Sequence, residues 1–478
     1  MNKQYDAVVV GSGPNGLAAA ITLAQKGLSV VVIEAKDTVG GGTRTAEFTL
    51  PGFIHDVCSA VHPLGAVSPF FRSLKLEHYG LQWIYPPAAL AHPLDDGTAV
   101  LLDKSIEKTA QSLGADGAPY TEIMEPLVKE WDRIIEDLLK PLSLPRHPIP
   151  FIRFSRYAYR SAYGLANCLF KQGRAKALFA GLGAHSIMPL ERYFTASFSL
   201  MLGLLGHAVG WPIAEGGSQR IADALVSYLH AFGGYVETGT YISSLDDLPK
   251  ARVILLDITP RQFAQIAERE LNDRYVKSLR TFKYGPGVFK IDWALDCPIP
   301  WKASECESAA TVHIGGTIEE ISQSEDAAWK GKHPDRPFVI LAQQSLFDHT
   351  RAPVGNHTAW AYCHVPNGST TDMTEQIEAQ VERFAPGFRE CILARHTMST
   401  SDLEQYNPNY VGGDIAGGTQ DFWQIFARPA LRFGSPYATP LRGLYLCSSS
   451  QPPGSGVHGM CGHYAALSAL HDAIKLDD

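Results

Sequence analysis

The first part of the chain switches between two patterns of apolar residues. Residues 5–10 and 29–34 are short, β-branched apolar runs, whereas residues 18–23 between them carry small and aliphatic side chains that suit a helix. Gly27 stands where that helix would end. Continuous apolar runs of this length are typical of strands buried on both faces. The pattern therefore predicts a compact βαβ unit.

The pattern changes several times along the rest of the chain. Residues 68–207 have mostly helical spacing, residues 208–282 combine a glycine-flanked helix with strands, residues 283–404 alternate short strands with Pro and Gly turns, and residues 405–478 return to strand, loop and helix. We expect an α/β fold. In this fold we expect a Rossmann-like domain to be interleaved with a substrate domain, which consists of a helical region and a mixed sheet. The Rossmann-like domain would be built from residues 1–67, 208–282 and 405–478.

Composition narrows the class of protein. Of 478 residues, 45% are apolar and 19% charged, with a net charge of −8, which argues against intrinsic disorder and against a nucleic-acid partner. The eight cysteines are dispersed without a CxxC pair, and we expect reduced thiols. Because the first four residues lead directly into an apolar run, we expect no leader, and we expect residues 194–211 to form a buried helix rather than a membrane span. We expect a soluble cytoplasmic protein without a metal.

A glycine motif follows the first predicted strand. Gly11, Gly13 and Gly16 form GxGxxG, which permits a tight turn, close approach of a pyrophosphate, and packing of helix on strand. The phosphates would lie at a helix N-terminus. Glu34 ends the second strand, 18 residues after Gly16, where it would accept hydrogen bonds from an adenosine ribose. This spacing predicts a dinucleotide site that disfavours NADP.

Two further glycine segments favour FAD over NAD. Residues 40–42 form a second glycine turn that would bring more N–H groups to the pyrophosphate, although an ordinary loop is the alternative. Residues 454–459 also match GxGxxG, but the 19 residues that follow are too few for a second Rossmann unit. We interpret them as a helix N-terminus directed at the flavin ring, the alternative being a capped surface helix.

These motifs resemble the FAD-dependent phytoene desaturase-like oxidoreductases, which share the glutathione-reductase and amine-oxidase type of FAD fold. The resemblance runs the whole length and is specific for FAD rather than for a substrate. It implies non-covalent FAD, with Arg44 and Ser448 as departures from the usual motif. The cofactor contacts that it implies are Gly11, Gly13, Pro14, Asn15, Gly16, Glu34, Ala35, Gly41, Gly42, Thr43, Arg44, Val236, Ser448, Gly456, Val457 and Met460.

Candidate catalytic residues are few, because a flavin performs the redox chemistry itself. His62 and His458 stand in segments expected near the flavin ring, where a histidine could act as a general base; structural histidines are the alternative. His207 and Trp211 are candidates for the substrate cavity, with core packing as the alternative.

The resemblance implies a dehydrogenase, desaturase or isomerase for a small hydrophobic substrate of isoprenoid or carotenoid type. Oxygen, a quinone or another acceptor would reoxidise the reduced flavin. The alternatives are a flavin amine oxidase and a non-enzymatic prenyl-binding protein of the GDP-dissociation-inhibitor type. Residues 146–176 are basic and aromatic, with a solvated helix face or peripheral membrane contact as the two interpretations.

Overall fold

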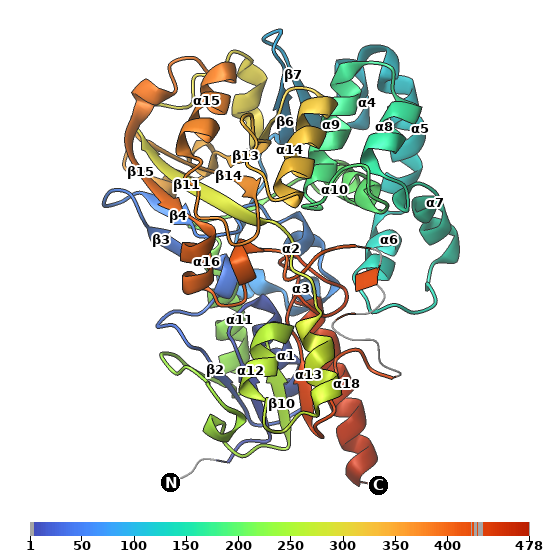
Figure 1. Ribbon diagram of the computed structural model, residues 1–478, viewed down its shortest axis with the longest axis vertical. Coiled ribbons are helices and arrows are strands. Elements are labelled where there is room, and N and C mark those ends of the chain that lie inside the picture. Colours follow the sequence, from blue (N-terminus) through green and yellow to red (C-terminus); the bar gives the residue numbers. More distant parts are fainter. Residues whose placement is uncertain (1–3, 422, 425–427, 429–433, 478) are drawn as a thin grey trace.

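The computed structural model describes residues 4–421, 423–424, 428 and 434–477. It has two parts, each built around one large sheet (Figure 1). The lower part contains both termini and a parallel sheet, and the upper part contains a mixed sheet flanked by a block of helices.

The lower sheet has five parallel strands in the order β16-β10-β1-β2-β9. Its strands are β1 (Ala7–Val10), β2 (Val30–Ile33), β9 (Tyr235–Glu237), β10 (Val253–Leu256) and β16 (Leu444–Leu446). Three distant stretches of the chain therefore build one sheet. This confirms the interleaved, Rossmann-like α/β fold.

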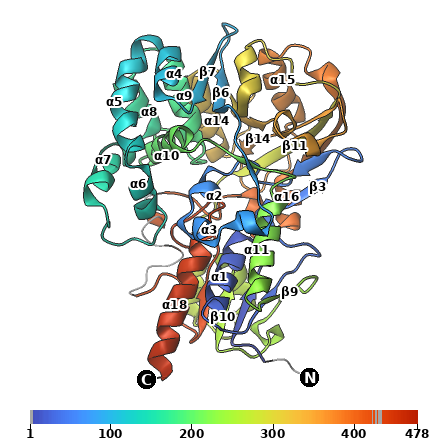
Figure 2. The ribbon, with the colours of Figure 1, turned by 180° about the vertical axis from the view of Figure 1, so that it is seen from behind.

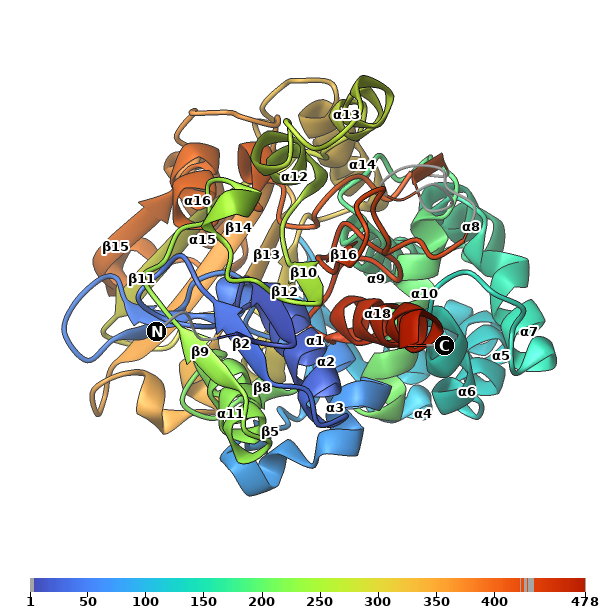
Figure 3. The ribbon, with the colours of Figure 1, turned by 90° about the horizontal axis from the view of Figure 1, so that it is seen from below.

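Helices cover both faces of this sheet (Figure 3). They are α1 (Pro14–Ala24), α11 (Gln219–Ala231), α12 (Pro260–Ile266), α13 (Asp273–Arg280) and α18 (Met460–Asp477). Val9 and Val32 pack in the core of α1, α11 and α18, whereas Val8 and Val31 pack in the core of α12 and α13. Successive side chains along each strand therefore point into two different cores. Because both faces of the sheet are buried, these runs are apolar throughout.

The upper sheet has seven strands in the order β15-β11-β14-β13-β12-β6-β7. Its strands are β6 (Ala88–Pro93), β7 (Ala99–Asp103), β11 (Gly287–Leu295), β12 (Ala309–Ile314), β13 (Val339–Ala342), β14 (His357–Val365) and β15 (Ile392–Met398). All its pairings are antiparallel except β12 with β6. Strands β6 and β7 come from the stretch that the sequence predicts as mostly helical. The helices α14 (Ile318–Trp329) and α15 (Thr374–Phe384) pack against this sheet.

A block of helices completes the upper part (Figure 2). Its members are α4 (Ile106–Ser112), α5 (Gly117–Val128), α6 (Trp131–Leu138), α7 (Pro148–Ala158), α8 (Ala162–Leu169), α9 (Gly173–Ala184) and α10 (Thr195–Ala208). Most residues of α10 are buried, as the sequence predicts for this segment. No helix in the described part of the chain is long and apolar enough to cross a membrane.

Short elements join the two parts. They are β3 (Thr45–Glu47), β4 (Ile54–Asp56), α2 (Pro63–Val67), α3 (Pro69–Leu74), β5 (Trp83–Ile84), β8 (Ile213–Ala214) and α16 (Thr400–Tyr406). Strand β5 pairs with β8, and β3 pairs with β4. The first crossover therefore begins directly after the second glycine turn, so the residues around it lie between the two sheets.

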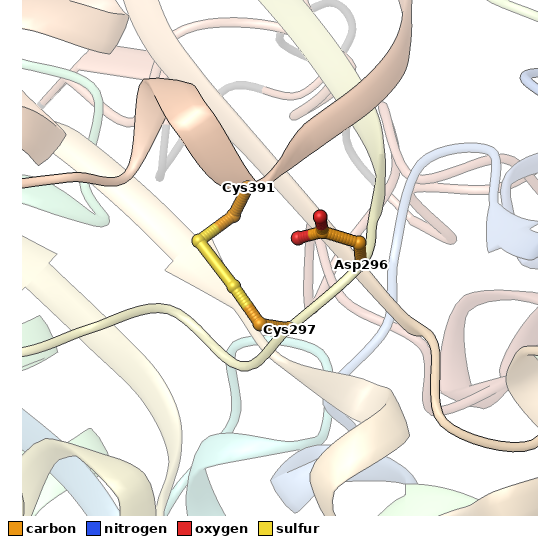
Figure 4. Close-up of side chains that lie close together, drawn as sticks. All are labelled: Asp296, Cys297 and Cys391. Carbon is orange, nitrogen blue, oxygen red and sulfur yellow. A yellow bond between two sulfur atoms is a disulfide. The ribbon is translucent and has the colours of Figure 1, made fainter.

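The expectation of eight reduced thiols is wrong. Cys297 and Cys391 form a disulfide, with their Cα atoms 5.7 Å apart (Figure 4). The cysteines lie 94 residues apart in the chain. They meet because β11 and β15 are neighbours and Leu295 pairs with Ile392. Spacing along the sequence carries no information about such a long-range strand pairing.

Candidate active site

One cavity of about 440 Å³ runs between the two parts of the molecule. At one end it is lined by Gly11, Gly13 and Glu34, with Gly16 behind the lining, and at the other by side chains of α10 and of the upper sheet. Its size is in the range of cofactor and ligand sites. Below, the first end is called the dinucleotide end and the second the apolar end.

The dinucleotide end is built around the N-terminus of α1. Gly11 has a φ of 98°, which favours glycine. A Cβ on Gly16 would lie 2.0 Å from the carbonyl oxygen of Gly11, so only glycine lets the helix pack this closely on the turn. A Cβ on Gly13 would lie 2.9 Å from Oδ2 of Asp257. The motif therefore forms the turn that the sequence predicts.

Asp257 is a site residue that the sequence analysis missed. It follows β10 directly, and its Oδ2 accepts a hydrogen bond of 2.9 Å from the backbone N–H of Gly16. Burial, with a smaller contribution from nearby Glu34, raises its pKa to about 7 against the opposing effect of the hydrogen bond from Gly16. The sequence does contain a signal for Asp257, because an acidic residue at the carboxyl end of a predicted parallel strand lies at the edge of the sheet where ligands bind.

Glu34 lines the cavity with its carboxylate already engaged. Its Oε2 accepts from the N–H and the hydroxyl of Ser12 at 2.9 and 2.6 Å. Its Oε1 accepts from the N–H of Lys36 at 2.9 Å and from the guanidinium of Arg44 at 3.0 Å. Arg44 is buried and lies over the ring of Tyr406. Arg44 thus neutralises Glu34, and Glu34 holds the glycine turn through Ser12.

The second glycine turn lies against the first. A Cβ on Gly41 would lie 3.1 Å from the Cα of Gly13, and one on Gly42 would lie 2.3 Å from the hydroxyl of Tyr410. The hydroxyl of Tyr406 donates to the carbonyl of Gly41 at 3.1 Å. The two glycine turns therefore face the same space, which favours the interpretation of residues 40–42 as part of the cofactor site over an ordinary loop.

The remaining predicted cofactor contacts divide into two groups. The cavity lining includes Pro14, Asn15, Ala35, Thr43, Gly456 and Val457, whereas Val236, Ser448 and Met460 lie outside it. Val236 is in β9, paired with Val32 of β2. The nearby residues that do line the cavity are Thr240, Tyr241 and Ile242. The roles of individual residues in holding FAD stay predictions.

The C-terminal helix begins close to α1. A Cβ on Gly462 would lie 1.7 Å from the carbonyl oxygen of Asn15, so the N-termini of the two helices are in contact. His458 does not line the cavity; its Nδ1 accepts the N–H of Met460 at 3.0 Å, and its carbonyl accepts the hydroxyl of Ser68 at 2.6 Å. His458 therefore caps α18 instead of facing the cavity.

The apolar end is lined mainly by large hydrophobic side chains. They include Ile187, Phe198, Met201, Leu202, Ile340 and Trp360. Trp211 lines this end as predicted, but His207 does not: its Nε2 pairs with the hydroxyl of Tyr120 at 2.7 Å. The sequence analysis missed His185, which lines the cavity, has its Nε2 2.9 Å from Nε2 of His313, and has its pKa lowered by burial to about 3.

His62 lines the cavity between the two ends. The hydroxyl of Ser218 donates to the carbonyl of Ser59 at 2.6 Å, so His62 Nε2 must donate its proton to that hydroxyl at 2.8 Å. Burial lowers the pKa of His62 to about 4, against the attraction of Asp56. His62 is therefore neutral at pH 7, and its Nδ1 is a lone pair with no partner among the described residues.

Comparison with known proteins agrees with this geometry. The family model "NAD(P)-binding Rossmann-like domain" matches residues 9–74. The chain is 26% identical to the rat "Pyridine nucleotide-disulfide oxidoreductase domain-containing protein 2", over 99% of this chain and 94% of that protein. It is 24% identical to the neurosporene-forming phytoene desaturase of Rhodobacter capsulatus, over 95% and 92%. Over nearly its whole length the chain is therefore similar to oxidoreductases of the phytoene desaturase-like type.

The fold of this oxidoreductase is also found among solved structures. An oxidoreductase from Methanosarcina mazei superposes with a TM-score of 0.67 at 16% identity, covering 97% of this chain and 99% of that one. The cofactor that these comparisons support is FAD. The dinucleotide end fits it: two glycine turns clear space at the N-terminus of α1, and the buried Oδ1 of Asn15 has no partner among the described residues.

Proposed function

We propose that this FAD-dependent oxidoreductase dehydrogenates, desaturates or isomerises a neutral hydrophobic substrate that lies in the apolar end of the cavity. The observation that carries the proposal is the distribution of charge. Glu34 and Asp257, both at the dinucleotide end, are the acidic residues among the described side chains that line the cavity. Among the described side chains, the apolar end therefore offers no carboxylate to hold a cationic amine, which favours a neutral substrate over the amine-oxidase alternative.

FAD supplies the acceptor for two electrons when it is bound. The chain's own contribution is to orient the substrate, exclude water and move a proton. The aromatic and aliphatic side chains of the apolar end replace water around the substrate. His62 is the proposed proton acceptor, because it is neutral and its Nδ1 lone pair is unused among the described residues. The proposed electron acceptor that restores the oxidised cofactor is oxygen, a quinone or another small molecule.

A matched pair of variants tests the character of the apolar end. Met201 lines the cavity from α10 and is only partly buried. In Met201→Glu a carboxylate enters the apolar end, and Met201→Gln adds a neutral polar group of the same size. The measurement is the change in the visible flavin spectrum on titration with a cyclic terpene hydrocarbon and with a primary alkylamine.

We expect the wild type to respond to the hydrocarbon and not to the amine. Met201→Glu should weaken the response to the hydrocarbon and create one to the amine, whereas Met201→Gln should keep the wild-type preference. A wild-type protein that responds to the amine alone would favour an amine oxidase instead.

A surface at the start of α7 supports a second part of the proposal, peripheral contact with an anionic membrane. Leu144 is 91% exposed, Ile149 72% and Ile152 65%. Arg146 and Arg153 are exposed beside them, and neither forms an ion pair with a described residue. Exposed apolar side chains next to unpaired cations fit the boundary of an anionic lipid surface better than a solvated helix face.

A further inference from the structure

Three potential metal ligands meet where β11 ends and β15 begins. Asp296 and Cys297 follow β11, and Cys391 directly precedes β15. The N–H of Asp296 donates to the carbonyl of Cys391 at 3.0 Å, so the backbone itself holds the two segments together. A carboxylate oxygen and both sulfur atoms lie within 4.8 Å of one another (Figure 4). No other group of three such side chains has this spacing among the residues that the structure describes.

The surroundings of this cluster favour a cation and give it access. Asp296 is exposed, Cys297 is half-buried and Cys391 is buried, so the cluster is open on one side. Asp296 forms no ion pair with a basic side chain in the described part of the chain. Glu390 adds a second negative charge next to Cys391 in the sequence.

We propose that Cys297 and Cys391, once reduced, form a zinc site with Asp296. Thiolates and carboxylates are ordinary zinc ligands, at about 2.3 Å for sulfur and about 2.0–2.2 Å for oxygen. Ligand atoms of a tetrahedral site then lie about 3.5–4 Å apart. The two sulfur atoms, which are bonded to each other in the disulfide, therefore move apart once they are reduced, while the backbone keeps the Cα atoms 5.7 Å apart. Water takes the fourth position. The site is independent of FAD and of the substrate.

The exchange between the two states is chemically balanced. A dithiol reductant gives two electrons and two protons to the disulfide, which becomes two thiols while the reductant becomes a disulfide. Zn²⁺ then displaces the two thiol protons and binds the thiolates. In the reverse direction a small-molecule disulfide takes two electrons from the thiolates and two protons from solvent, becomes two thiols, and the Cys297–Cys391 disulfide re-forms as the ion is released.

Both states link the same two segments. The disulfide joins residues 94 positions apart and ties β15, the edge strand of the seven-stranded sheet, to the end of β11. Under reducing conditions the disulfide is lost, and the zinc site restores the link. The cluster thus keeps the sheet edge closed in either redox condition.

The test is zinc binding by the FAD-loaded protein before and after reduction with a dithiol, followed by removal of the reductant. Zinc alone is the probe, and bound metal is measured after gel filtration. Cobalt(II) is the spectroscopic probe, because thiolate ligation gives a charge-transfer band in the near ultraviolet. The variants are Cys297→Ser, Asp296→Asn, which keeps both cysteines, and Cys168→Ser, which removes an exposed free thiol elsewhere.

We expect the reduced wild type and Cys168→Ser to bind a single zinc ion per chain and the oxidised wild type to bind none. Asp296→Asn should weaken zinc binding by at least about tenfold, since even the loss of an outer partner of a ligand costs that much. Cys297→Ser should lose the cobalt charge-transfer band. Equal zinc binding by oxidised and reduced wild type, or an unchanged affinity in Asp296→Asn, would overturn the proposal.

Discussion

Asp257 determines the charge of the dinucleotide end more than any residue of the glycine motif. Its carboxyl group lies against Gly11, Gly13 and Gly16, where the pyrophosphate of FAD would approach. Because burial raises its pKa to about 7, this carboxyl group is partly protonated at neutral pH. A protonated carboxyl group does not repel phosphate, and an ionised one does. FAD binding is therefore linked to the protonation of Asp257.

The linkage predicts how FAD affinity depends on pH. As pH rises through the pKa of Asp257, the carboxyl group loses its proton and repels the phosphates, so the dissociation constant should rise several-fold between about pH 6 and about pH 8. Asp257→Asn keeps an acceptor for the N–H of Gly16 and should flatten this dependence. The control is Asp116→Asn, which changes another buried carboxyl group that accepts backbone N–H groups and should leave the pH dependence as in the wild type. Fluorescence titration of the apoprotein with FAD measures the dissociation constant at each pH. A wild-type dissociation constant that does not change with pH would refute the linkage.

Local chemistry decides which elements the sequence predicts well. The βαβ unit is predicted to within a few residues, because β-branched runs and glycines specify it locally. Gly27 does take a φ of 81°, two residues past the C-cap Gln25. The disulfide and the exclusion of His207 and Val236 from the cavity depend on which strands and helices become neighbours. That information lies in long-range packing, which no local pattern contains.

Helix α7 carries the prediction at the scale of one element. Its buried residues Phe154 and Ala158 pack inward, whereas Ile149 and Ile152 face outward. Leu144→Ser with Ile149→Ser removes two side chains whose full insertion contributes about 1.5–3 kcal/mol each, so binding to vesicles should fall at least about tenfold. The measurement is cosedimentation with vesicles that contain phosphatidylglycerol.

The control for this prediction is Val354→Ser, which removes an equally exposed apolar side chain elsewhere. It should bind vesicles like the wild type. Vesicles of phosphatidylcholine alone should bind the wild type weakly, because they lack the negative charge that the arginines meet. Equal sedimentation of wild type and double variant would show that this face is only solvated.

At the scale of the whole molecule, one cavity connects two differently built parts. The parallel sheet contributes the glycine turns and Asp257, and α10 with the seven-stranded sheet contributes the apolar end. Only the two parts together form a cavity that has both a dinucleotide end and an apolar end. The interleaved chain path makes this possible, because the crossovers between the parts pass through the cavity lining at His62 and Trp211.

The most direct test of this arrangement is anaerobic mixing of the FAD-loaded protein with a panel of neutral hydrophobic molecules and with primary amines of matching size. The visible absorbance of the flavin is recorded during mixing. We predict that a neutral molecule bleaches the flavin and that the amines leave it oxidised. Bleaching by amines, with none by any neutral molecule, would contradict the central claim that the cavity presents FAD to a neutral apolar substrate.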